Sequence, residues 1–257
     1  MIIIKTLEEL DKMREGGKNL AYIVSEVAKA CKPGVTTNDL NELTAQLIKE
    51  KGDSSAILNY TPYGAKRPFP AVSCISINDE IVHGIPNEDP KTLVEGDIVG
   101  IDIAIVHKGL IVDHATTVPV GNISHEAKKL LSVTREALQA GIKEARVGNH
   151  IGDIGAAIQK HAEKNKYSVV QGLCGHGVGR EIHEDPYVPN EGRRGDGDLL
   201  VAGMTIAIEP MFAIGTGKIK TASDGYTYLT KDGSLSAQFE HTVAITERGP
   251  EILTKIK

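Results

Sequence analysis

A short pattern occurs twice in this chain and constrains its fold more than any other feature. Residues 94–102 read V-E-G-D-I-V-G-I-D, and residues 201–209, 107 positions further on, read V-A-G-M-T-I-A-I-E. Both copies have Val, then Gly two positions later, and end in a β-branched residue, a small residue, Ile and an acid. A weaker match, 114 positions apart, aligns residues 34–40 with residues 148–154. Chance similarity between strands is the alternative, but the pattern predicts two copies of one structural unit.

Helix signals repeat in the same order. Apolar residues at helical spacing predict helices over 6–31 and 124–145, and Ser124 is a natural N-cap. A second helix follows each of these, one beginning near Thr36 in a capping-box pattern and one covering about 150–165. Strand-like runs follow each helix pair. The sequence therefore predicts an α/β (α+β) fold of two αα-ββ halves.

The two halves cover about residues 1–120 and 121–257, and we expect residues 1–257 to form a single domain. At this length roughly three quarters of the unfolded surface can be buried, so the core needs no disulfide or structural metal. The last strand-like stretch, 226–246, predicts a hairpin.

Composition and cysteine usage describe an ordinary globular protein in a reducing compartment. The net charge of −5 argues against a partner bound through nucleic-acid phosphates. Cys31, Cys74 and Cys174 are widely spaced and lack CxxC spacing, so we expect free thiols, as in the cytoplasm. The apolar run in MIIIKTLEEL is too short for a signal peptide or a membrane span. We expect a soluble, cytoplasmic monomer.

Two aspartates fall in successive strand-like runs. If Lys108-Gly109 forms a two-residue turn, Asp113 opposes Ala104 and is the diagonal neighbour of Asp102 on one face. A three-residue turn would place the two acids on opposite faces unless a bulge restored them. Two buried carboxylates side by side repel, so they must share a proton or a cation.

Further acids and histidines occur where a metal site would need them. Glu209 and Glu240 are flanked by apolar strand-like residues, and His176 stands between two glycines. His83 and His183 are either site residues or loop residues on this pattern. The remaining histidines that fall on predicted turns or polar helix faces should be solvated: His107, His125, His150 and His161.

Four carboxylates and one imidazole, without a thiol, suit Mn²⁺, Fe²⁺, Co²⁺ or Mg²⁺ better than a structural zinc. Five side chains, some of them bridging, suit two ions better than one. Two ions about 3.5–4 Å apart would hold a hydroxide between them and lower its pKa towards about 7. This donor set predicts a hydrolase.

The motifs SINDEIVHGIP, GDIVGIDIAIVHKG, GHGVGREIHEDP, TIAIEPM and SLSAQFEHT resemble, in order and spacing, the class I methionine aminopeptidases of the short, bacterial type. The resemblance runs over nearly the whole chain. It implies the pita-bread fold, with pseudo-two-fold halves around a central, mostly antiparallel sheet. It also implies removal of the initiator methionine from nascent chains when the second residue is small, by a metal-bridged hydroxide.

The resemblance assigns the site residues. It implies two divalent ions (Co, Mn, Fe, Zn or similar), held by Asp102, Asp113, His176, Glu209 and Glu240. Asp113 and Glu240 would bridge both ions. Glu209 would also shuttle protons between the attacking water and the leaving amine. His83 would bond near the scissile nitrogen, and His183 would stabilise the oxyanion.

The methionine pocket of the family would be lined here by Phe69, Cys74, Ile182 and Tyr226, with Tyr60 and Tyr63 as further candidates. Ordinary core packing is the alternative for each. Three features depart from the family. Asp113 is followed by His114, where a small residue usually follows the ligand, and on a regular strand His114 points away from the metals, so we expect it to be structural. The segment 60–70 is longer and more basic, and Ile182 and Tyr226 replace larger aromatic residues.

Two other functions compete with this one. The prolidase and proline-aminopeptidase group shares the fold but usually carries a large domain before the catalytic one, for which the early first repeat leaves no room. A catalytically silent module on the same fold would be expected to have lost ligands, and all five are present. Nascent chains are the expected partner, and ribosome association follows from the family alone.

Overall fold

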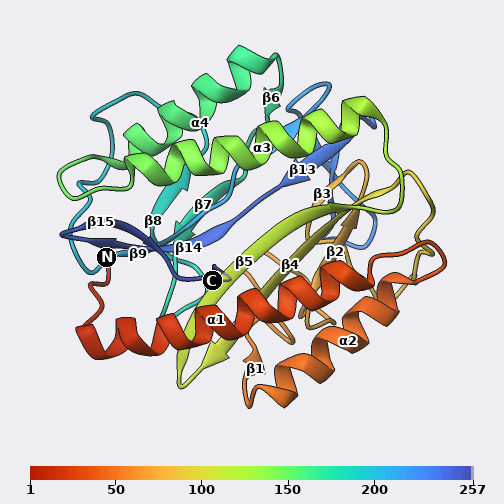
Figure 1. Cartoon of the computed structure of the whole chain (residues 1–257), viewed down its shortest axis with the longest axis horizontal. Coiled ribbons are helices and arrows are strands. Elements are labelled where there is room, and N and C mark those ends of the chain that lie inside the picture. Colours follow the sequence, from red (N-terminus) through yellow and green to blue (C-terminus); the bar gives the residue numbers. More distant parts are fainter. Residues whose placement is uncertain (256–257) are drawn as a thin grey trace.

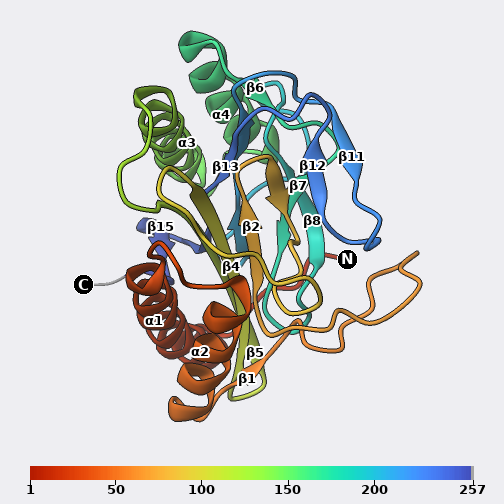
Figure 2. The ribbon, with the colours of Figure 1, turned by 90° about the vertical axis from the view of Figure 1, so that its right-hand side faces the viewer.

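The computed structural model describes residues 1–255. Four helices lie on one side of the strands (Figures 1 and 2). The helices are α1 (Leu7–Ala30), α2 (Thr37–Glu50), α3 (His125–Glu144) and α4 (Ile151–Asn165). The strands of the first half are β1 (Ser54–Ser55), β2 (Cys74–Ile77), β3 (Glu80–Val82), β4 (Ile98–His107) and β5 (Leu110–Pro119). Those of the second are β6 (Ser168–Val169), β7 (Cys174–Gly177), β8 (Glu184–Pro189), β9 (Thr205–Ile208), β10 (Met211–Ala213), β11 (Ile219–Thr221), β12 (Tyr228–Thr230), β13 (Ser236–Gln238), β14 (His241–Thr246) and β15 (Gly249–Ile252).

The hairpin of β4 and β5 has the predicted register. His107 pairs with Leu110 and Ala104 with Asp113, so the connection is a two-residue turn. Lys108 (φ 49°) and Gly109 (φ 81°) both have positive φ, as a type I′ turn requires. The side-chain alternation therefore places Asp102 and Asp113 on one face.

The predicted duplication is confirmed by matched details of the backbone. Isolated bridges join Thr36 to Thr92 and His150 to Leu199, at the offsets of 114 and 107 found in the sequence. The carboxylates of Asp39 and Asp153 each accept the N–H of the residue before their helix at 2.8 Å. Gly96 and Gly203, which align in the nine-residue pattern, have φ of 103° and 90°.

The second half contains two strand pairs that break at equivalent points. β9 pairs with β14 and β10 pairs with β13, all antiparallel. The chain leaves regular strand structure at Glu209–Pro210 and at Phe239–Glu240, between these pairs. The hairpin predicted over 226–246 is wrong, because β12 pairs with β3 and β11 instead. Apolar stretches in the sequence predict where strands occur, but they do not predict which strands pair.

Two buried threonines join the halves. Thr117 on β5 donates to the carbonyl of Gln238 at 2.7 Å and accepts its N–H at 3.0 Å. Thr242 on β14 makes the same pair of bonds with the backbone of Asp113, at 2.8 and 2.9 Å. β5 therefore lies against β13 and β14 at the centre of the molecule, which brings the acids of both halves together.

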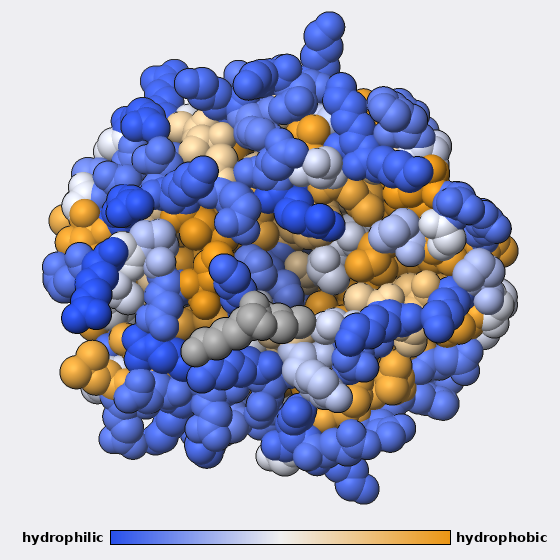
Figure 3. All heavy atoms as spheres, viewed as in Figure 1, coloured by the Kyte–Doolittle hydropathy of each residue, from blue (hydrophilic) through white to orange (hydrophobic). Residues whose placement is uncertain are grey.

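Each helix pair covers its own apolar cluster. One cluster is formed by residues of α1, α2, β4 and β5, and the other by residues of α3, α4, β9 and β14. The helix face is largely polar, with apolar side chains visible in its grooves (Figure 3). Among residues 1–255, no helix is both long and apolar enough to cross a bilayer. The prediction that His107 is solvated is wrong. It is buried, and its Nδ1 lies 2.6 Å from Asp53 Oδ1.

Candidate metal centre

The two aspartates and two glutamates reach the centre from different backbone contexts. Asp102 and Asp113 lie within the unbroken strands β4 and β5, on one face. Glu209 follows β9 and Glu240 precedes β14, each at a break between strand pairs. Both glutamates therefore lie outside the regular strand segments. The N–H of Glu240 donates to the carbonyl of Ala115 on β5 at 2.9 Å.

His176 brings an imidazole to these carboxylates. Its Nε2 lies 3.6 Å from Glu209 Oε1 and 4.0 Å from Asp113 Oδ2. Its Nδ1 lies 2.9 Å from the carbonyl of Gly177, which leaves Nε2 facing the acids. One ligand atom each from Asp113, His176 and Glu240 lie within 4.8 Å of one another. Such spacing fits a shared cation.

Burial shifts the protonation of every group in this cluster towards neutrality. It raises the pKa of Asp113 to about 6 and holds the pKa values of Asp102, Glu209 and Glu240 well above their usual ranges. Repulsion between the carboxylates adds to the effect for these three. Burial lowers the pKa of His176 to about 3. Acids cost free energy to ionise here unless cations neutralise them.

Two of the buried oxygens have no hydrogen-bond partner within the described residues. They are Asp113 Oδ1 and Glu240 Oε1. A buried carboxylate oxygen without a donor costs free energy, so in a native site it points to an ion or water. The donor set is four carboxylates and a neutral imidazole, which suits divalent ions. The residues therefore fit the predicted metal group.

Sequence reasoning missed the residues that support these side chains. Gln238 Nε2 donates to Glu209 Oε2 at 3.1 Å, and Asn190 Nδ2 donates to the Glu209 carbonyl at 3.0 Å. His114 Nδ1 donates to the Glu240 carbonyl at 2.5 Å. For Gln238 a signal was present, because it lies two positions before Glu240 in a strand-like run. Nothing local in the sequence marked Asn190.

Both predicted substrate-facing histidines lie beside the cluster. The His183 ring meets the His176 ring edge-on, with centroids 4.5 Å apart. The Tyr60 hydroxyl lies 3.0 Å from His183 Nδ1, so the other ring nitrogen is left for the cleft. His83 has a positive φ of 60°, and burial lowers its pKa to about 4. Both imidazoles are therefore neutral at pH 7.

A small cavity of about 90 Å³ opens beside the aspartates. The four predicted pocket residues all line it: Phe69, Cys74, Ile182 and Tyr226. Tyr60 lines it as well, together with Ile57 and both histidines. Tyr63 does not. It is fully exposed on the rim of the cleft outside.

That cleft, of about 580 Å³, shares Tyr60, His83 and His183 with the small cavity and also contains His176 and Glu209. The site is thus a narrow, mainly apolar cavity that opens, past the acids and histidines, into a wider cleft of mixed lining. A chain end can enter the cavity while the rest of the chain lies in the cleft.

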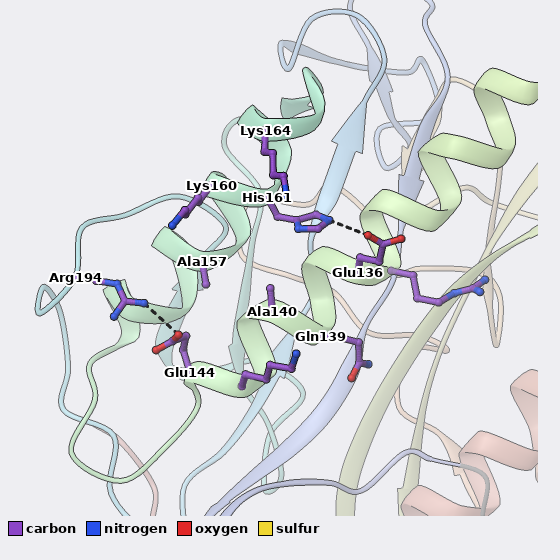
Figure 4. A pocket seen from close by; sticks show the side chains of 11 residues that line it. Glu136, Gln139, Ala140, Glu144, Ala157, Lys160, His161, Lys164 and Arg194 are labelled. Atoms are coloured by element: carbon purple, nitrogen blue, oxygen red, sulfur yellow. Dashed lines mark hydrogen bonds and ion pairs between the residues drawn. The ribbon is translucent and has the colours of Figure 1, made fainter.

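A separate hollow of about 640 Å³ lies between α3 and α4 (Figure 4). It contains none of the predicted site residues. Arg194 Nη2 lies 3.1 Å from Glu144 Oε1, and His161 Nε2 lies 3.4 Å from Glu136 Oε2. His161, which we expected to be solvated, is half-buried here. The chemistry of this hollow is that of a charged helix surface.

Comparison with known proteins agrees with this geometry. Residues 11–247 match metallopeptidase family M24. The methionine aminopeptidase of Clostridium acetobutylicum is 47% identical over 254 residues, which cover 99% of each chain. The crystal structure of the methionine aminopeptidase from Thermotoga maritima matches with a TM-score of 0.94 and 42% identity, covering 100% of both chains. The prolidase of Pyrococcus furiosus shares the fold, with a TM-score of 0.77 at 22% identity, but this chain covers only 66% of it. The chain therefore belongs to metallopeptidase family M24 and, within that family, to the methionine aminopeptidases.

Proposed function

We propose that this chain is a metal-dependent aminopeptidase that hydrolyses the first peptide bond of polypeptides beginning with methionine, when the second residue is small. The observation that carries the proposal is a narrow apolar cavity that Asp102 and Asp113 line, beside the possible metal-binding group of Asp113, His176 and Glu240. A cavity of this size accepts one side chain, so the acids meet the bond that follows the first residue. This geometry favours an exopeptidase over an endopeptidase.

Asp102, Asp113, His176, Glu209 and Glu240 would hold two divalent ions. Charge balance supports two ions rather than one, because four ionised carboxylates carry four negative charges and two divalent cations neutralise them. Asp113 and Glu240 come from opposite halves, and each has a buried oxygen without a partner among residues 1–255, which supports both as ligands. Bound there, the ions would polarise the scissile carbonyl and lower the pKa of a water molecule.

The protein side chains supply the proton transfers and the orientation. Glu209 would take the proton of the attacking water and later deliver it to the leaving amine, a role typically worth about 10²–10⁴-fold. The amide of Gln238 holds one of its oxygens in place. His183 would donate a hydrogen bond to the developing oxyanion, and His83 would bond near the scissile nitrogen. Both are neutral, so they donate without adding charge.

The apolar lining would select the methionine side chain. Phe69, Cys74, Ile182 and Tyr226 line the small cavity, and Phe69, Cys74 and Tyr226 belong to one apolar cluster. An unbranched thioether fits a narrow apolar site better than a branched chain of the same polarity. The substrate beyond the second residue would leave along the cleft that holds Tyr63.

Turnover by metal-stripped protein tests the proposal. Protein re-titrated with Mn²⁺, Fe²⁺, Co²⁺ or Zn²⁺ should release methionine from Met-Ala-Ser and leave Leu-Ala-Ser almost uncleaved. Asp113→Ala and His176→Ala should abolish release. Folded protein that releases methionine with none of these metals would contradict the proposal, as would variants that keep full turnover.

We further propose that residues 1–257 act as one catalytic domain, as a monomer in the cytoplasm. The single-domain proposal is supported by the ligands drawn from both halves, and the location by three free thiols. Nascent chains would be the substrates, with ribosome association as part of that task. The net charge of −5 supports a partner other than nucleic acid.

A further inference from the structure

The loop of residues 60–69 forms one wall of the small cavity. Its ends are tied together, because the N–H of Phe69 donates to the Tyr60 carbonyl and the N–H of Asn59 donates to the Phe69 carbonyl, each at 2.9 Å. The loop extends from the molecule on the same side as β8 (Figure 2). Backbone pairing fixes its base. The position of the rest of the loop depends on side chains.

Arg67 fastens this loop to two other segments. Its Nη1 binds Oε1 of Glu88, its Nη2 lies 2.6 Å from Oε2 of the same carboxylate, and Nη2 also donates to the Asp224 carbonyl at 3.3 Å. A bidentate arginine–carboxylate pair fixes orientation as well as distance. Both side chains are over a third exposed, so the pair adds little to stability. The effect of the pair is to fix the position of the loop.

The contacts of Arg67 converge on Tyr226, a wall of the cavity. The Tyr226 hydroxyl donates to the Arg67 carbonyl, and the guanidinium carbon lies 5.8 Å from the Tyr226 ring centroid. The ring of Phe69 meets the Tyr226 ring edge-on at 5.2 Å. The Tyr226 N–H donates to the Asp224 carboxylate at 2.7 Å. Tyr226 is thus held between the loop and residue 224.

We propose that Arg67 is a positioning residue that sets the width of the methionine cavity through Tyr226 and Phe69. The inference rests on the proposed function, which assigns this cavity to the first side chain of the substrate. Methionine and leucine are both apolar, so only shape separates them. A wall that can shift admits the branched side chain and holds the unbranched one less tightly. The loop of residues 60–69 therefore contributes to the selection of methionine over leucine.

The test compares Arg67→Met with Arg14→Met in the metal-loaded enzyme. Arg14 makes a similar bidentate pair with Glu251, at 2.8 and 2.7 Å, but on α1, and it does not line the cavity. Arg67→Met should raise KM for Met-Ala-Ser about fivefold. It should also lower the preference for Met-Ala-Ser over Leu-Ala-Ser about tenfold, which is within the discrimination that an apolar pocket achieves between side chains differing by one methylene. Its kcat for Met-Ala-Ser should stay within about twofold of the wild type, as expected for lost ground-state binding. Arg14→Met should change neither KM nor preference.

Two further variants separate position from charge. Glu88→Gln should change KM and preference as Arg67→Met does. Arg67→Lys should show the same changes although it keeps the positive charge, because lysine cannot form the bidentate pair. If Arg67→Met matches Arg14→Met in KM and preference, or loses kcat alone, the inference is wrong while the proposed function stands. A wild-type enzyme that releases no methionine with any metal would overturn the proposed function itself.

Discussion

Thr242 and Asp113 form two hydrogen bonds with each other across the boundary between the two halves. The Thr242 hydroxyl donates to the Asp113 carbonyl at 2.8 Å and accepts the Asp113 N–H at 2.9 Å. Both residues are buried. A threonine from the second half therefore fixes the backbone of a predicted ligand from the first.

Replacing Thr242 by valine keeps the shape of the side chain and removes the hydroxyl. We expect the free energy of unfolding to fall by about 1–3 kcal/mol, because the Asp113 backbone loses a partner for two buried groups. Affinity for Mn²⁺ should fall about 10–100-fold, as for other groups that orient ligands. Denaturant unfolding and calorimetric titration measure the two effects. Thr246→Val, on the same strand, removes one hydrogen bond to the Gly249 carbonyl and one from the Arg248 N–H, and should leave metal affinity unchanged.

The contribution of Asp113 to the stability of the metal-free protein should be larger at pH 5 than at pH 7. Burial raises the pKa of Asp113 from 3.8 to about 6, so the folded state binds a proton that the unfolded chain has released. This stabilisation is complete below pH 3.8 and is lost as the pH rises through about 6. Thermal unfolding of chelated wild type and Asp113→Asn at both pH values checks it. The wild type should lose stability relative to the variant as the pH rises from 5 to 7, and the buried histidines, whose lowered pKa values act in the opposite direction, are present in both proteins. Saturating Mn²⁺ should raise Tm most at pH 7.

Glu9 should give the opposite pH dependence. The pKa of Glu9 is lowered to about 2, mainly by its hydrogen bond with the Arg180 guanidinium and next by the hydrogen bond from the Thr6 backbone at the start of α1. Its stabilisation is therefore present above the usual pKa of 4.5 and is lost as the pH falls towards about 2. Because the partner Arg180 is half-exposed and solvent screens the pair, we expect Glu9→Gln to cost only about 1 kcal/mol at pH 7. Denaturant unfolding at pH 7, 5 and 3.5 should show this difference shrinking, and a constant difference would contradict the assignment.

Tyr60 and Tyr63 lie three positions apart but should behave differently. The Tyr60 hydroxyl lies 3.0 Å from His183 Nδ1, whereas Tyr63 is fully exposed. We expect Tyr60→Phe to lower kcat/KM for Met-Ala-Ser about tenfold, because His183 loses the group that orients its ring. Tyr63→Phe should have no effect. Steady-state kinetics of both variants, with equal metal content, decides between them.

The sequence predicted those features that depend on local chemistry. The register of β4 and β5 followed from the two-residue turn at Lys108-Gly109, and it placed Asp102 and Asp113 on one face. Helix ends followed from side chains that cap the backbone, as at Ser124. The duplicated pattern indicated two copies of one structural unit, each with an acid at the end of the repeated segment.

Features that depend on distant partners were not predictable. Gln238 and Asn190 support Glu209 from segments whose neighbours only the folded chain reveals. His107 comes directly before the polar turn Lys108-Gly109, yet Asp53, far away in the sequence, pairs with it in the interior. β12 pairs with β3, which no local pattern in residues 226–246 indicates.

The bridges Thr36–Thr92 and His150–Leu199 carry a consequence for ancestry. Two copies of one αα-ββ chain, associated about a dyad, would have placed equivalent acids against each other without any linker between them. Gene fusion would then have freed each copy to diverge, so that one now carries aspartates in straight strands and the other glutamates at breaks. The second half alone supplies the imidazole of His176. Such divergence would therefore have turned an approximately symmetric cation site into an asymmetric one.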